Sequence, residues 1–124
     1  MEEKLIMHAK EGRKHAYAPY SHYLVGAAAE DEKGRIYTGC NIENGSYGAT
    51  MCAERTAIFK AVSEGAEKIN KIAITAEDNM PYPCGMCRQV MSEFCSSDTK
   101  VILECDGKVE IYTFGELMPY GFRL

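Results

Sequence analysis

The sequence predicts an α/β fold in which helices cover both faces of a mixed, five-stranded sheet, a three-layer α-β-α sandwich. Helical and strand-like segments follow one another in the order α-β-β-α-β-α-β-β, which combines a hairpin with strand–helix–strand crossovers. The chain has 124 residues, of which 46% are apolar, enough for one core. We therefore expect a single domain over residues 1–124.

The first half of the chain supplies a helix, a hairpin and a second helix. Residues 2–17 show helical periodicity, with apolar residues on one face. Residues 23–29 and 35–42 are strand-like and flank the turn "EDEKG", which predicts a hairpin. A helix is expected from Met51 to Ser63, because its apolar residues share one face and Gly65 follows as a C-cap.

The second half alternates a strand, a helix and two short strands. Residues 68–76, "KINKIAITA", predict a buried strand, and a helix is expected from Cys84 through "CRQVMSEF" after the loop "EDNMPYP". Residues 100–105 and 108–113 predict two strands separated by the turn "DG". The segment "TFGE" that follows has the capping-box pattern, which predicts one last helical turn.

The charge pattern favours a small-molecule partner over a nucleic acid polymer. The formal net charge is −4, and lysine and arginine are scattered instead of forming the basic stripe typical of a polynucleotide-binding protein. No segment approaches the roughly 20 apolar residues of a membrane span. The N-terminal residues lack the apolar run of a signal peptide, so we expect a cytoplasmic protein without a membrane partner.

Six cysteines are the most informative part of the composition. They are Cys40, Cys52, Cys84, Cys87, Cys95 and Cys105. In a small secreted protein they would indicate a disulfide framework, but in a chain without a secretion signal metal binding or burial is the better interpretation.

Three of these cysteines stand at the starts of the two central helices. Cys84 and Cys87, at i and i+3, share one face of a helix N-terminus, and Cys52 begins the other helix. The positive end of a helix dipole favours thiolates, so the three together predict a zinc site. With three protein ligands the fourth position is left for water, as in catalytic sites, and Glu54 could then serve as a proton shuttle.

A structural interpretation of the same residues stays open. A fourth cysteine, Cys40, Cys95 or Cys105, could close a structural zinc site. Glu54 could equally be an ordinary surface acid favoured by the helix dipole.

The segment "CNIEN" carries a second signal. On a strand, Asn41 and Glu43 point to one face and Ile42 to the other. Two neighbouring polar groups at a strand end suit a ribose hydroxyl, which both donates and accepts, although a solvated strand end would look the same.

The combination of "CAE" with "PCGMC" resembles the zinc-dependent cytidine/deoxycytidylate deaminase superfamily. The resemblance extends through "YAPYSHYLVGAA", "GCNIENGSYG", "CAERTAIFKAVSEG", "PCGMCRQVMSEF" and "ELMPYGF", which match the small, all-cysteine cytidine deaminases over nearly the whole chain. It implies a cytidine deaminase-like fold and a hydrolase of pyrimidine salvage. Such an enzyme converts cytidine and 2'-deoxycytidine to uridine and 2'-deoxyuridine.

The resemblance also implies roles for individual residues. One zinc ion per chain would be held by Cys52, Cys84 and Cys87, and Glu54 would move protons between water, N3 of the pyrimidine and the departing ammonia. Arg55 would donate hydrogen bonds to the sulfurs, unless it is a surface salt-bridge residue. The substrate-binding positions implied by the resemblance are Tyr23, Asn41, Glu43, Gly45, Tyr47, Ala53 and Phe122.

Family members are homotetramers, and Tyr47 and Phe122 match positions that line the site across subunit boundaries, so the resemblance implies the same assembly here. Three positions depart from the family pattern. Tyr23 stands where phenylalanine is usual, and Gly45 and Met86 each stand where alanine is commoner.

Three competing functions remain at this point. A blasticidin S-type aminonucleoside deaminase has the same C-A-E pattern, but Asn41 and Glu43 favour cytidine. A structural zinc protein or a regulatory nucleoside-binding protein would not need Glu54. A polynucleotide editor is disfavoured by the negative charge.

Overall fold

A computed structural model describes residues 2–122 of the chain. Five strands form one mixed sheet in the order β2-β1-β3-β4-β5. They are β1 (Val25–Asp31), β2 (Ile36–Cys40), β3 (Ile69–Ala76), β4 (Cys95–Cys105) and β5 (Lys108–Thr113). The central pair, β3 and β4, is parallel, and the other neighbouring pairs are antiparallel. The mixed five-stranded sheet predicted from the sequence is therefore confirmed.

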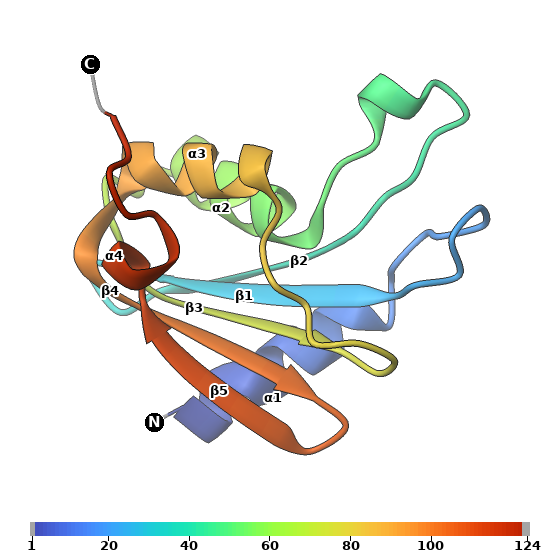
Figure 1. The fold of residues 1–124 in the computed structure, drawn as a ribbon, viewed down its shortest axis with the longest axis horizontal. Helices are drawn as coiled ribbons and strands as arrows, with labels where there is room; N and C mark the ends of the chain where they lie inside the picture. Colours follow the sequence, from blue (N-terminus) through green and yellow to red (C-terminus); the bar gives the residue numbers. More distant parts are fainter. Residues whose placement is uncertain (1, 123–124) are drawn as a thin grey trace.

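Helices cover both faces of this sheet (Figure 1). Helix α1 (Glu2–Arg13) lies on one face, and α2 (Ala53–Ser63) and α3 (Gly85–Phe94) lie side by side on the other. A short 3₁₀ helix, η1 (Tyr47–Ala49), precedes α2, and α4 (Phe114–Leu117) follows β5. These layers are the expected α-β-α sandwich.

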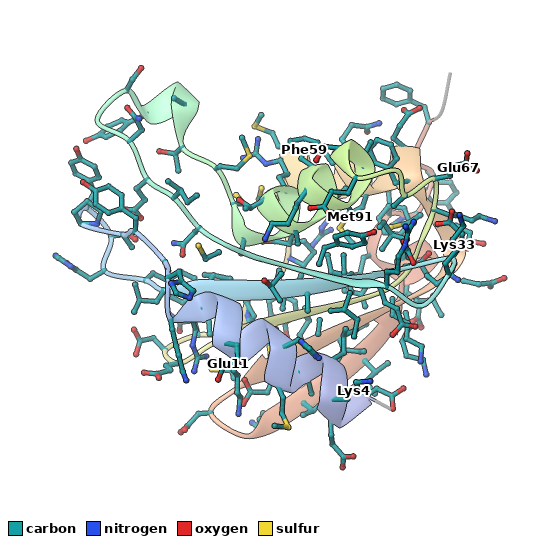
Figure 2. All side chains as sticks on the ribbon, turned by 180° about the vertical axis from the view of Figure 1, so that it is seen from behind. Lys4, Glu11, Lys33, Phe59, Glu67 and Met91 are labelled. Atoms are coloured by element: carbon teal, nitrogen blue, oxygen red, sulfur yellow. The ribbon has the colours of Figure 1, made fainter. Side chains whose placement is uncertain are left out.

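The two faces of the sheet have separate apolar cores. Under α1, Leu5, Ile6 and Ala9 pack on Ala28, Ala73 and Ile102 of three central strands. The larger core lies under α2 and α3, where Met91 is fully buried between α3 and the sheet, whereas Lys4 and Glu11 point to solvent from α1 (Figure 2). The larger core holds both central helices against the strands.

Helix α2 lies very close to β2 because a glycine faces it. A Cβ atom at Gly39 would come within 2.5 Å of the backbone nitrogen of Ala57 and 2.8 Å of the carbonyl oxygen of Ala53. Only a residue without a side chain permits this approach, which sets where α2 begins.

The first helix is shorter than predicted. The periodicity favours residues 2–17, but α1 ends at Arg13, and three i→i−3 hydrogen bonds follow as far as Ala16. Tyr17 then donates its N–H to the carbonyl of Asn41 (2.9 Å) and accepts from the N–H of Glu43 (2.8 Å). This long-range pairing replaces the helical hydrogen bonds of the last predicted turn.

Strand β4 is longer than predicted. The pattern indicates residues 100–105, but the strand begins at Cys95, immediately after α3, and Cys95 pairs with Ile69 of β3. The register with β3 then jumps from Cys95 to Lys100, and the Thr99 hydroxyl fixes the segment between them by accepting from the N–H of Ser96 (3.0 Å) and donating to the carbonyl of Ile69 (2.8 Å). The predicted capping box is confirmed, since Thr113 and Glu116 exchange side-chain and backbone hydrogen bonds at the start of α4.

Candidate metal centre and active site

Helices α2 and α3 begin at the same end of their layer, and a cysteine is the N-cap of each (Figure 1). Cys52 and Cys84 both have extended backbone conformations there, and the Cys84 sulfur accepts a hydrogen bond from the N–H of Cys87 (3.5 Å). The sequence predicts all three cysteines at the helix starts, and the structure brings them together. Their sulfur atoms lie within 4.8 Å of one another.

The sulfur spacing fits a zinc ion. Two sulfurs at about 2.3 Å from a tetrahedral zinc lie roughly 3.8 Å apart. The Sγ atoms of Cys52 and Cys84 are 3.9 Å apart, and those of Cys84 and Cys87 are 3.4 Å apart. Among residues 2–122 no fourth cysteine or other metal-binding side chain joins this group. The donor set is thus three thiols, the arrangement typical of a catalytic site.

Arg55 places a positive charge against the cluster. Its Nη2 atom donates to the Cys52 sulfur at 3.4 Å, while its Nε atom is buried with no hydrogen-bond partner in the described chain. A hydrogen bond from the Cys87 thiol, with a further contribution from Arg55, lowers the pKa of Cys52 to about 5 against the opposing effect of burial. The same hydrogen bond, reinforced by burial, raises the pKa of Cys87. The site therefore stabilises a thiolate on Cys52 even before a metal binds.

Glu54 lies in the first turn of α2, directly beside the cysteines. Its side chain is buried, and burial raises its pKa to about 7, with a further contribution from the Cys52 thiolate, although its own backbone N–H opposes the shift. A carboxyl group with such a pKa is present in both protonation states near neutral pH. It can therefore accept a proton in one step and donate it in another.

A cavity of about 460 Å³ opens beside Glu54 and two of the cysteines. Its lining residues are Ser21, Tyr23, Val25, Asn41, Glu43, Thr50, Met51, Cys52, Ala53, Glu54, Asn79, Met80, Pro81, Tyr82 and Cys84. Four of the seven predicted substrate-binding residues, Tyr23, Asn41, Glu43 and Ala53, line the cavity, and the other three do not.

Asn41 and Glu43 of "CNIEN" line the cavity, and Ile42 between them is exposed. The Asn41 amide accepts from the N–H of Val25 (3.0 Å) and donates to the carbonyl of Tyr23 (2.7 Å). Asn41 thereby also ties the end of β2 to the start of β1. The strand predicted over residues 35–42 ends at Cys40, so Asn41 and Glu43 lie just beyond β2, where Ile42 forms isolated bridges with Tyr17 and Met51.

The Glu43 carboxylate is held by the segment that precedes β1. It accepts from the N–H groups of Tyr20 (2.9 Å) and Ser21 (3.1 Å), and from the Ser21 hydroxyl. These bonds, the hydroxyl first, hold the pKa of Glu43 below its usual value. A fixed, ionised carboxylate in a cavity wall is a strong acceptor for a hydroxyl group.

Tyr23, at a position where phenylalanine is usual in the family, uses its hydroxyl group in the structure. Its ring lies in the cavity wall, and its hydroxyl donates to the carbonyl oxygen of Asn79 at 2.7 Å. The hydroxyl therefore joins two walls of the cavity, which a phenylalanine could not do.

Gly45, Tyr47 and Phe122 lie outside the cavity of the single chain. Tyr47 is 78% exposed and makes an edge contact with Tyr20, with ring centroids 6.2 Å apart. Phe122 is 65% exposed. Within residues 2–122 neither aromatic residue reaches the cavity.

Sequence reasoning missed the wall formed by Asn79, Met80, Pro81 and Tyr82, together with Ser21. The wall lies in the loop "EDNMPYP", which has no periodicity. Its position directly before Cys84 is the one signal that could have indicated a role at the site.

Comparison with known proteins decides the family. Residues 1–105 match the family model described as the cytidine and deoxycytidylate deaminase zinc-binding region. The chain belongs to this deaminase family.

Similar members cover almost the whole chain. A cytidine deaminase of Sporosarcina psychrophila is 49% identical over 97% of this chain and 90% of its own length. One of Halalkalibacterium halodurans is 49% identical over 97% and 92%, respectively. The crystal structure of a cytidine deaminase from Burkholderia pseudomallei superposes with a TM-score of 0.93 at 42% identity, covering 98% of this chain and 99% of that one. The deaminase fold predicted from the sequence is confirmed, as is membership of a zinc-binding family.

Proposed function

We propose that this deaminase converts cytidine and 2'-deoxycytidine, with water, to uridine and 2'-deoxyuridine and ammonia. The observation that carries the proposal is the buried carboxyl of Glu54 beside three clustered thiols, at a cavity that also presents Asn41 and Glu43. The similar proteins named cytidine deaminases support the same reaction.

Cys52, Cys84 and Cys87 would hold one zinc ion, and Arg55 would donate to the Cys52 sulfur. When bound, zinc supplies the chemistry of a Lewis acid, lowering the pKa of water so that a nucleophile exists near neutral pH. Arg55 offsets part of the negative charge that three thiolates bring to the centre.

Glu54 would carry the proton through the reaction. Its carboxylate accepts a proton from the attacking water and delivers it to N3 of the pyrimidine as water adds at C4. It accepts the second proton of that water and passes it to the exocyclic amino group, which leaves as ammonia. One side chain with a pKa of about 7 is suited to both roles.

Asn41 and Glu43 would bind the sugar hydroxyls, with Tyr23 and Ala53 as neighbouring cavity walls. Glu43 has the fixed, charged oxygen that accepts from a hydroxyl. Asn41 would keep its contacts to Val25 and Tyr23 and contribute through its remaining hydrogen-bonding capacity.

We also propose a homotetramer with sites at subunit interfaces, acting in pyrimidine salvage in the cytoplasm. Tyr47 and Phe122 are largely exposed in the single chain, as residues that complete a neighbour's site would be, and Gly45, two residues before Tyr47, is exposed as well. Light scattering on the purified protein at micromolar concentration tests the assembly, and a monomer would refute it. The described part of the chain contains no helix with the length and apolar character needed to cross a bilayer.

The test of function is a cytidine deamination assay with zinc quantified per chain. Purified, folded, zinc-loaded protein should cause the loss of cytidine absorbance and release ammonia. The absence of turnover in that sample would refute the proposal. Assaying blasticidin S in parallel measures the preference between the two nucleoside classes, and cytidine should be the better substrate.

The alternative to an enzyme is a protein that binds zinc but catalyses no reaction. X-ray absorption separates the two, because three sulfurs and one light-atom ligand fit the enzyme, whereas four sulfurs fit a structural site. We expect the first result, since Cys40, Cys95 and Cys105 lie outside the described thiol group.

A further inference from the structure

One wall of the cavity is an irregular loop held by side chains from elsewhere in the fold. It runs from the end of β3 to the start of α3 and contributes Asn79, Met80, Pro81 and Tyr82 to the lining. Tyr23 donates to the carbonyl of Asn79 at 2.7 Å, and at the other end Arg88 donates to the carbonyl of Pro83 at 2.9 Å. The side chain of Tyr82 has its own anchor, on the edge strand β5.

That anchor is the carboxylate of Glu110. Its Oε1 atom accepts from the hydroxyl of Tyr82 at 2.7 Å and from the hydroxyl of Tyr112 at 2.6 Å. The two rings are neighbours, with centroids 6.4 Å apart. Hydrogen bonds from two phenols hold the pKa of Glu110 below its usual value, so the acceptor is an ionised carboxylate, for which such bonds are stronger than between neutral groups.

Tyr82 stands at the metal end of the cavity. It is two residues from Cys84, and both residues line the same cavity together with Cys52 and Glu54. If the reaction proposed above takes place there, C4 of the pyrimidine must lie at this end. The groups attached to C4 and to its neighbour C5 then lie nearest to the wall that carries Tyr82.

We propose that Tyr82 limits the substituents that the pyrimidine can carry at N4 or C5, and that Glu110 is a positioning residue that holds Tyr82 in this wall. The inference rests on the proposed function and adds a specificity determinant to it. Glu110 acts from outside the cavity, because it lies on β5 and does not line the site. Removing the anchor frees the tyrosine ring from its fixed position in the wall, which relaxes the limit.

The test compares four variants with the wild type: Glu110→Ala, Glu110→Gln, Tyr82→Phe and Tyr112→Phe. Each is assayed on cytidine, 5-methylcytidine and N4-methylcytidine. In Glu110→Ala and Tyr82→Phe the ratio of kcat/KM for a substituted substrate to that for cytidine should rise by roughly threefold to tenfold, the range for one partly exposed hydrogen bond. Glu110→Gln should keep most of the wild-type ratio, because the glutamine carbonyl still accepts from Tyr82.

Tyr112→Phe is the matched control. It removes the other phenol from the same carboxylate oxygen and leaves the bond from Tyr82 in place. Its substrate ratios should therefore equal those of the wild type. Ratios that stay unchanged in both Glu110→Ala and Tyr82→Phe would overturn the proposal, as would a change in Tyr112→Phe as large as theirs.

A binding measurement makes the result independent of turnover. Calorimetric dissociation constants for uridine and 5-methyluridine should change in the same sense, with Glu110→Ala favouring the methylated ligand relative to the wild type. A wild-type protein that binds uridine without deaminating cytidine would refute the proposed reaction, while the binding ratio would still decide whether Tyr82 and Glu110 set the width of the cavity.

Discussion

Two carboxylates face the same cavity, and their surroundings give them opposite acidities. Glu54 is buried beside a thiolate, which raises its pKa to about 7, whereas Glu43 accepts three hydrogen bonds that lower its pKa. A carboxyl that exchanges its proton near neutral pH suits acid–base chemistry, and one that stays ionised suits recognition of a hydroxyl group. The residue types are the same, so the environment assigns the roles.

Replacing Glu54 by glutamine should remove proton transfer while keeping the shape of the site. We expect kcat to fall by roughly 10² to 10⁴-fold, the usual contribution of a general acid–base group. Zinc content per chain should stay at the wild-type value, because Glu54 is not among the three thiol ligands. Glu64→Gln, at the exposed C-cap of α2, is the control and should retain full activity. Substantial residual turnover in Glu54→Gln would show that another group moves the proton.

Cys52 should be the reactive thiol of the metal-free protein. Its pKa is lowered to about 5, chiefly by the Cys87 thiol and then by Arg55, so the thiolate exists above that pH and reactivity is lost only as the pH falls through about 5. Iodoacetamide labelling followed by peptide mass spectrometry should modify Cys52 already at pH 6. Cys40, whose pKa is raised by burial, serves as the internal reference. Labelling of Cys52 that begins only above pH 8 would contradict this assignment.

At the scale of the elements, the close approach of α2 to β2 places the N-terminus of α2. The approach depends on Gly39, where a Cβ atom would clash with the backbone of α2 at Ala53 and Ala57. Ala53 directly follows Cys52, so any displacement of α2 also displaces Cys52 and Glu54 from the partner sulfurs on α3.

Gly39→Ala should therefore cost both stability and activity. Overpacking of this kind lowers the free energy of unfolding by about 1–3 kcal/mol, which a shift in the urea midpoint at constant m-value would measure. Gly48→Ala is the matched control, because a Cβ there meets no atom within 4 Å, and its unfolding free energy should stay within about 0.5 kcal/mol of the wild type. Equal stability of the two variants would mean that α2 can shift without penalty.

The boundaries of the helices and strands show which features a sequence pattern predicts and which it does not. The capping box at Thr113 and the cysteines at the helix starts were readable because caps are decided within three or four residues. The end of α1 and the start of β4 were misplaced, since Tyr17 and Cys95 form their backbone contacts with segments distant in sequence. Local preference predicts an element well only where its neighbours do not compete for the backbone.

At the scale of the whole molecule, the metal site would join two helices that are distant in sequence. Cys52 belongs to the start of α2, and Cys84 and Cys87 to the start of α3, with β3 between the two helices along the chain. A ligand that binds only the folded arrangement stabilises the whole domain by mass action.

Removing zinc should lower the melting temperature of the protein. With free zinc at about 1,000 times its dissociation constant, the stabilisation is about 4 kcal/mol, which corresponds to a shift on the order of 10 °C for a domain of this size. Differential scanning calorimetry with and without a chelator measures the shift. Cys84→Ser should abolish the difference, whereas Cys105→Ser, outside the thiol group, should preserve it. A shift that persists unchanged in Cys84→Ser would place the metal elsewhere.

What could be inferred from the sequence rests on short-range relations. The spacing of Cys84 and Cys87, the position of Cys52 beside Glu54, and the alternation of Asn41 and Glu43 follow from helix and strand periods. Together with the family resemblance, these relations were enough to predict the α-β-α sheet architecture and the zinc-binding family.

Only the tertiary structure decided how these groups meet. No local rule gives the 3.9 Å between the sulfurs of Cys52 and Cys84 or the hydrogen bond between Tyr82 and Glu110, because each pair is distant in sequence. The burial that raises the pKa of Glu54 likewise comes from the packing of several layers. The cavity wall from Asn79 to Tyr82 could not be predicted from the sequence either, because its irregular backbone has no helical or strand periodicity. The reason is physical: periodicity sets which way a side chain points, but its distance to a partner and its exposure to water depend on the packing of the complete chain.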